Sequence, residues 1–139
     1  MTYPTYPVSN IPNMEPDAVD RFKSFGIRTT AGLLDAAKNP QGRKLLAGKT
    51  GIDEKRILNW ANAADRMRIK GIGAEYSELL RAAGVDTVKE LKYRNPAKLA
   101  EAMAEANAKN KLAGVLPSPR AVERWVEQAR RIQLKITYR

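Results

Sequence analysis

One short segment of the chain is basic and then rich in glycine. Its residues are Arg66, Arg68, Lys70, Gly71, Ile72 and Gly73. Glycines in such a turn permit backbone conformations that strain other residues, and Ile72 between them can anchor the turn in a core. The turn also leaves backbone N–H groups free at the start of the next helix. Because these groups and the helix dipole favour an anion, the chemistry expected here is binding of one phosphate group.

The same pattern has a second interpretation, in which the glycines form a tight connection between two helices and bind no ligand. Glu75 and Glu78 follow the turn directly. A turn of this kind that binds DNA would more often carry lysine at these positions. A short glycine motif does not by itself decide between a phosphate site and a simple connection.

The last helix offers a second candidate surface. Residues 109–139 carry a net charge of +6, compared with zero for residues 69–108 and +4 for residues 1–68. At helical spacing Arg120, Arg124 and Arg131 fall on one side, and Arg130 lies nearby. This face is either a contact surface for an anion or an ordinary solvated helix face.

Composition restricts the chemistry further. The 139 residues include no cysteine and no histidine, and the formal net charge is +10. The usual nucleophile, general base and zinc ligands are therefore absent together, so we expect no enzyme, no metal site and no cofactor. A strongly basic protein of this kind favours an anionic partner, with nucleic acid as the leading candidate.

The elements that position these residues come from an internal repeat. Residues 69–91 match residues 11–33 at a constant offset of 58, which pairs Gly84 with Gly26 and Leu91 with Leu33. Towards the end of each copy the offset grows to 65, which pairs Trp125 with Trp60. Both tryptophans lie within apolar stripes at helical spacing, so we predict that they anchor the core.

The pattern of an apolar residue, any residue, glycine, an apolar residue and glycine before a helix is that of a helix-hairpin-helix. We therefore predict an all-α fold of about eight short helices, in two tandem helix-hairpin-helix-like repeats that share one compact body. The expected bounds are an N-terminal arm at 1–10, repeats at 11–68 and 69–132, and a C-terminal tail at 133–139. We expect the tail to be extended and strand-like.

The first repeat departs from the hairpin pattern. Asn13 and Glu15 stand where the second repeat has glycines, and Asp17 adds a further negative charge. Because carboxylates repel phosphate, we expect the first hairpin to be structural.

The residues from Ile11 to Ile132 resemble a bacterial family described only as domain of unknown function 4332. The resemblance rests on Ile69–Gly73, on the segment Leu80–Thr87, and on its weaker counterpart Phe22–Thr29. It implies tandem helix-hairpin-helix units. The similarity of such units to DNA-repair hairpins implies non-specific DNA binding by analogy alone.

Two functions follow as hypotheses. The first is non-catalytic, sequence-independent binding of nucleic acid, with double-stranded DNA as the expected partner. The alternative is a protein-interaction or assembly module that contacts an acidic protein surface or forms a homo-oligomer. In that case we expect the N-terminal arm or the C-terminal tail to dock on the partner. No apolar run approaches the ~20 residues of a membrane span, and Met1–Pro4 lacks the features of a secretory signal. We therefore expect a cytoplasmic protein with no membrane partner.

Overall fold

The computed structural model describes residues 3–139, and the regular structure within them is helical, as predicted. A 3₁₀ turn, η1 (Val8–Asn10), precedes eight α-helices. These are α1 (Pro16–Ser24), α2 (Thr30–Ala36), α3 (Pro40–Thr50), α4 (Glu54–Arg66), α5 (Ala74–Ala82), α6 (Val88–Lys92), α7 (Pro96–Asn110) and α8 (Pro119–Arg131). Across residues 3–139, no helix has the length and apolar character that crossing a bilayer requires.

Side-chain caps fix where most of these helices begin. Thr29, Asn39, Thr87, Asn95 and Ser118 each accept a hydrogen bond from a backbone N–H three residues further along. Such a cap satisfies one of the N–H groups that the first turn of a helix leaves unpaired. By contrast, the N-cap position of α5 is Gly73, which has no side chain to form a cap. The first turn of α5 therefore has no side-chain cap, and the same is true of α1 and α4.

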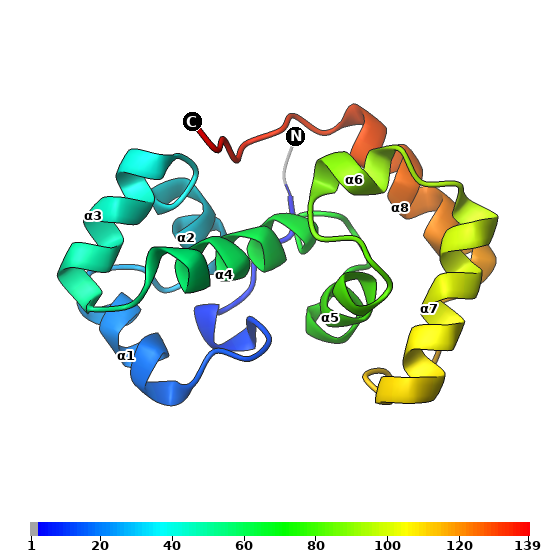
Figure 1. Cartoon of the computed structure of the whole chain (residues 1–139), viewed down its shortest axis with the longest axis horizontal. Coiled ribbons are helices and arrows are strands. Elements are labelled where there is room, and N and C mark those ends of the chain that lie inside the picture. The colour runs from blue at the N-terminus through cyan, green and yellow to red at the C-terminus, as the bar shows by residue number, and fades with distance from the viewer. Residues whose placement is uncertain (1–2) are drawn as a thin grey trace.

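The buried side chains form two clusters, one on each side of the chain's midpoint. The first draws on residues from Val8 to Ala64, and the second on residues from Ile69 to Ala129. Trp60 is 5% exposed in the first cluster and Trp125 is 3% exposed in the second, which confirms that both are core anchors. Figure 1 shows the corresponding arrangement, with α1–α3 on one side of the central α4 and α5–α8 towards the other.

Helices at corresponding positions of the two predicted repeats pack in corresponding pairs. In the first half α4 packs against α2 and α3, and in the second half α8 packs against α6 and α7. This parallel supports the predicted repeat, while the division of the chain at residues 68 and 69 stays a prediction. The two predicted repeats also differ in length, since α7 has 15 residues and α3, its predicted counterpart, has 11.

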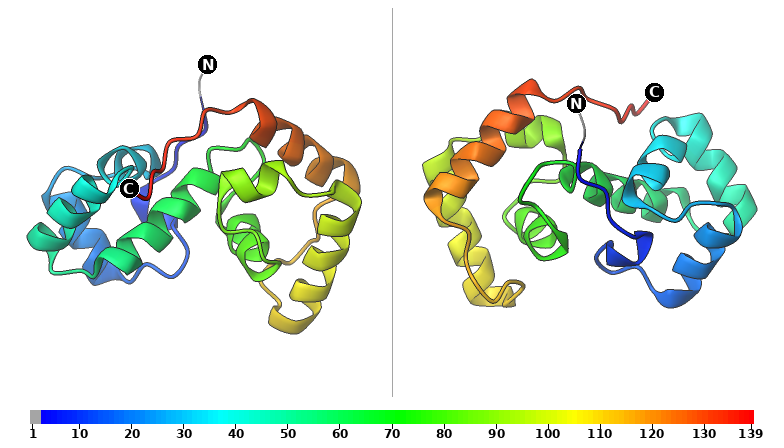
Figure 2. Two further views of the ribbon diagram at one scale, coloured as in Figure 1. Left: turned by 45° about the horizontal axis from the view of Figure 1, so that its top comes forward. Right: turned by 180° about the vertical axis from the view of Figure 1, so that it is seen from behind.

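The segments at the two ends contact the body of the protein. Residues 3–10 of the predicted arm are held where Val8 N donates to Arg28 O at 2.8 Å, and Val8 is fully buried. Met1 and Thr2, also part of that prediction, lie outside the described residues. The predicted tail is extended but does not form a strand. It leaves α8 and runs back towards the first half (Figure 2), where Thr137 N donates to Lys38 O at 2.7 Å.

Candidate nucleic-acid interface

The hairpin between α4 and α5 depends on one of its two glycines. Gly71 has φ +97°, in the left-handed region, and a Cβ there would lie 2.9 Å from Nε1 of Trp125. Gly73 has φ −91° and ψ −165°, and a Cβ there would meet no heavy atom within 4 Å. Ile72 between them is fully buried in the second cluster. Only Gly71 therefore needs to be glycine, both for its backbone conformation and for its close approach to Trp125.

The first hairpin also has a residue with positive φ at this position, but that residue is not glycine. Asn13, the counterpart of Gly71, has φ +63°, and Glu15, the counterpart of Gly73, is extended. Asparagine tolerates the left-handed region better than most residues do, which explains how the turn survives there. The side chain of Asn13 donates to Glu78 at 3.1 Å and so joins the first hairpin to α5.

The second hairpin lies directly against α8. The backbone N–H of Lys70 donates to Oε1 of Gln128 at 3.0 Å, and Nε2 of Gln128 donates back to the Lys70 carbonyl at 3.3 Å. Beside this contact is a pocket of about 460 Å³. It is lined by Lys70, Gly71, Tyr76, Leu116, Pro117, Ser118, Ala121, Arg124, Trp125 and Gln128. The fold thus brings the predicted glycine turn together with one predicted arginine of α8.

A neighbouring pocket extends this surface along α8. Lys70 and Gln128 line it as well, together with Arg131. Lys70 therefore lies between Arg124 and Arg131. We call the residues Lys70, Gly71, Arg124, Gln128 and Arg131 the hairpin–α8 surface.

The other two predicted arginines of α8 lie outside that surface. Arg120 is exposed and precedes Arg124 by one helical turn, so it extends the same face. Arg130 is exposed on a different flank, where its Nε donates to the Lys92 carbonyl at 3.4 Å. Arg130 is thus directed towards α6.

Arg66, which the sequence places at the hairpin, has a buried position. Its side chain is 1% exposed, its Nε donates to the backbone and side-chain oxygens of Ser77 at 3.1 Å, and its Nη1 donates to the Asp86 carbonyl at 2.7 Å. Burial lowers the pKa of Arg66 to about 10, so the guanidinium remains charged at neutral pH. This residue joins the end of α4 to α5 and to the start of α6.

Arg68 is also largely enclosed. It forms a buried ion pair with Asp65, with Nε 2.7 Å from the carboxylate, and its Nη2 donates to the Gln133 carbonyl at 3.0 Å. Burial raises the pKa of Asp65, and the charge of Arg68 opposes that rise. Arg66 and Arg68 are therefore held mainly by bonds within the protein, although one terminal nitrogen of each guanidinium has no partner among the described residues. Arg68 also lines the pocket that Lys70 and Arg131 share, but it is only 5% exposed there.

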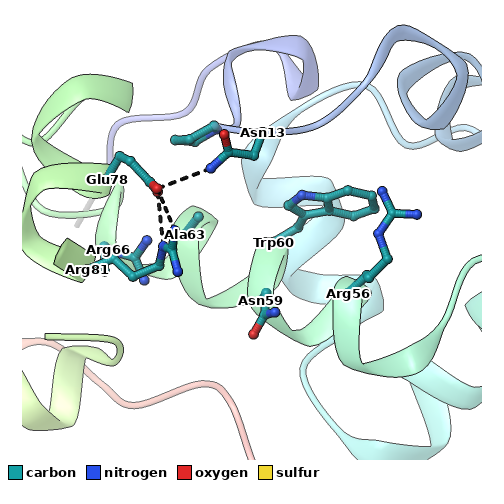
Figure 3. A pocket seen from close by; sticks show the side chains of 9 residues that line it. Asn13, Arg56, Asn59, Trp60, Ala63, Arg66, Glu78 and Arg81 are labelled. Atoms are coloured by element: carbon teal, nitrogen blue, oxygen red, sulfur yellow. Dashed lines mark hydrogen bonds and ion pairs between the residues drawn. The ribbon is translucent and has the colours of Figure 1, made fainter. Parts of the chain in front are cut away.

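A third pocket, of about 210 Å³, lies between the first hairpin, α4 and α5. Figure 3 shows Glu78 pointing towards Asn13 and Arg81, with Arg56 beside Trp60 at the other end of the pocket. Each arginine that lines it faces a carboxylate, in the pairs Arg56–Glu15, Arg81–Glu78 and Arg66–Asp86. This junction pocket is thus balanced in charge, whereas no carboxylate lines the pocket beside Gly71.

The pattern of the sequence did not single out Gln128, Tyr76 or Leu116, all of which line the pocket beside Gly71. A signal for Gln128 was present, because positions 124, 128 and 131 share one helix face at i, i+4 and i+7. Tyr76 and Leu116 carry no such signal, since their approach to α8 depends on how α5 and the loop at 111–118 pack.

Comparisons with known proteins place the chain in a family without assigning it a function. No curated protein and no solved structure matches it. A family model described as a domain of unknown function matches residues 12–132, which is most of the chain. The all-α fold and this match agree with the resemblance seen in the sequence. The chain therefore belongs to the family of domain of unknown function 4332.

Proposed function

We propose that this protein is a non-catalytic, sequence-independent nucleic-acid-binding protein that contacts phosphates through its hairpin–α8 surface. One observation carries the proposal. Lys70 and Gly71 of the hairpin and Arg124 of α8 line a single pocket that has no carboxylate among its lining residues. Two segments that the sequence singled out separately thus meet at one positively charged place.

The backbone near this surface also suits an anion. The N-cap position of α5 is Gly73, which provides no side-chain oxygen for the first-turn N–H groups. Those groups carry the positive end of the helix dipole, and a phosphate is a suitable acceptor for them. Contacts of this kind position a nucleic acid without reading its sequence.

The position of Glu78 just after the turn suggested that its charge would repel a phosphate, but its contacts weaken this effect. Its carboxylate accepts hydrogen bonds from Asn13 and Arg81 and lines the junction pocket (Figure 3). Since a paired charge has a weaker field at a distance, Glu78 reduces phosphate affinity less than an unpaired carboxylate would. Glu75 stays exposed after the turn and counts against the site.

The proposed contacts therefore differ from the set derived from sequence. They comprise the exposed cations Lys70, Arg120, Arg124 and Arg131 together with the hairpin backbone. Arg66 and Arg68 are left out because they are buried and bond to other parts of the chain, and Arg130 is left out because it is directed towards α6. Arg131 is kept because it is exposed on the same face as Arg124, although it forms an ion pair with Glu127 at 3.8 Å.

The alternative function is a protein-interaction or assembly module whose basic face contacts an acidic protein, with the N-terminal arm or the C-terminal tail docked on the partner. Tyr6 and Val8 of the arm and Thr137 of the tail make backbone hydrogen bonds to other parts of the chain, so these two segments are already engaged within the protein.

The experiment is a comparison of charge reversals. A Lys70→Glu/Arg124→Glu variant and a Lys44→Glu/Lys98→Glu control change the net charge equally, and all four side chains are exposed. Affinity for a labelled duplex of about 20 base pairs is measured by fluorescence anisotropy at fixed low salt. We expect the first variant to lose at least about tenfold more affinity than the control. Equal losses would reject the hairpin–α8 surface, and no binding by the wild-type protein would reject the function.

A further inference from the structure

We propose that the pocket between the hairpin and α8 receives one unpaired nucleotide of a bound strand. The protein would then bind nucleic acid that carries unpaired nucleotides more tightly than a blunt duplex. This inference rests on the proposed function, because Lys70 and Arg124 at the pocket supply the phosphate contacts of the same strand.

One side of the pocket is aromatic and apolar. Tyr76, Trp125, Leu116 and Pro117 all line it. The ring centroids of Tyr76 and Trp125 lie 5.3 Å apart. The Tyr76 hydroxyl donates to the Val115 carbonyl at 2.9 Å, which holds the tyrosine ring beside the loop at 111–118. Tyr76 is partly exposed and Leu116 is 45% exposed. A nucleobase has the flat apolar faces that favour contact with such a surface, and base–aromatic contact is tolerant of sequence.

The pocket also offers a hydrogen-bond donor. The indole Nε1 of Trp125 faces Gly71, where the missing side chain leaves open the space that a Cβ would fill at 2.9 Å. Both residues line the pocket, so an acceptor atom of a base or sugar placed here would be in a position to accept a hydrogen bond from the indole N–H.

The shape of the pocket distinguishes an unpaired nucleotide from a duplex. Contacts to the backbone of a duplex need only a positive surface, since its bases stay stacked inside the helix. This pocket has a volume of about 460 Å³, and both cationic and apolar residues line it. In the interior of a duplex each base is stacked on both faces, whereas a nucleotide outside the stack offers a phosphate and a base face to such a site at once.

The experiment compares two labelled probes at one salt concentration. The first is a blunt duplex of about 20 base pairs, and the second is the same duplex with a single-stranded extension of about four nucleotides. We expect the wild-type protein to bind the extended probe at least about fivefold more tightly, as one base–aromatic contact would provide.

Two loop variants locate the effect. Leu116→Asp introduces a carboxylate into the pocket at an exposed position, and Val115→Asp changes the next residue, which is 74% exposed and does not line the pocket. We expect the first variant to lose the preference for the extended probe and the second to keep it. Equal affinity of the wild-type protein for both probes would overturn this inference and leave the proposed function standing. A preference that survives Leu116→Asp would overturn the assignment to this pocket. No binding to either probe would overturn the proposed function, and this inference with it.

Discussion

At the scale of single residues, Gly71 links the hairpin to the core of the second half. Its φ of +97° is strained for other residues, and a side chain there would press on Trp125. We expect Gly71→Ala to lower the free energy of unfolding by about 1–3 kcal/mol, because it combines backbone strain with a close contact. Urea denaturation followed by tryptophan fluorescence measures this loss.

Gly73→Ala is the matched control in the same turn. Its backbone is extended and the space around a new Cβ is open, so stability should change by no more than about 0.5 kcal/mol. An equal loss in both variants would contradict our assignment of Gly71 as the essential glycine. Because Gly71→Ala disturbs the core, reduced DNA binding in that variant would not by itself locate a phosphate.

The buried pair of Asp65 and Arg68 makes a second prediction. Removing Asp65 leaves a guanidinium that is almost fully buried without its carboxylate. We expect Asp65→Ala to cost about 3–5 kcal/mol of stability, and Asp65→Leu/Arg68→Met to recover much of that loss. The double variant removes both charges and so tests whether the unpaired guanidinium causes the loss of stability. If the double variant is as unstable as Asp65→Ala, loss of the ion pair is not the cause.

The sequence predicted some of these residues well and others poorly. Helix caps such as Thr87 and Ser118 are local features, since each bonds three residues further along the chain. Arg66 is different, because its partners Ser77, in α5, and Asp86, in the connection before α6, lie further along the chain. Charge and spacing do not show which distant carbonyl oxygens will surround a guanidinium, so its burial became apparent only from the structure.

At the scale of helices, α5 joins the two halves through Glu78. Burial alone would raise the pKa of Glu78, but the hydrogen bond and charge of Arg81, with the hydrogen bond of Asn13, lower it overall. Folding therefore favours the ionised carboxylate. This contribution is fully present above the usual pKa of 4.5 and is lost as the pH falls through the lower pKa of the folded protein.

We expect the unfolding free energy of the wild-type protein to fall more steeply below pH 4.5 than that of Glu78→Gln. Urea denaturation of both proteins at a series of pH values between that value and the acid-unfolded state measures the two slopes. Identical slopes would mean that Glu78 makes no net contribution through its ionised form.

At this scale the sequence predicted α8 correctly but not what covers it. Its apolar stripe and its arginines follow helical spacing, so the face of Arg120, Arg124 and Arg131 was visible in advance. Its contact with the hairpin depends on Gln128, whose amide pairs with the backbone of Lys70. That pairing comes from tertiary packing, which the period of a helix does not encode.

At the scale of the whole molecule, the C-terminal tail ties the second half to the first. Nη2 of the buried Arg43 donates to the Thr137 carbonyl at 2.8 Å, and the Tyr138 hydroxyl donates to Asn62 at 3.3 Å. The sequence predicted an extended segment here, but not its return across the molecule (Figure 2).

We expect a truncation after Ile132 to reduce stability by about 1–3 kcal/mol, because it removes one acceptor from each of two buried guanidinium groups, those of Arg43 and Arg68. Amide hydrogen exchange should then increase in α3, where Arg43 lies, more than in α7. Removing Arg139 alone is the control, since it leaves the bonds of Thr137 and Tyr138 in place. Unchanged exchange in α3 would show that the tail does not stabilise the first half.

The central claim is that the hairpin and α8, which together form one surface, contact phosphates jointly. The most direct test is the dependence of duplex affinity on salt concentration. Each phosphate that a cation neutralises adds a slope of about −0.9 to the log–log plot. We predict that Lys70→Ala/Arg124→Ala makes the slope shallower by about two units and that Lys44→Ala/Lys98→Ala leaves it unchanged. A slope that stays the same in the first variant, in a protein that binds DNA and remains folded, would contradict the account.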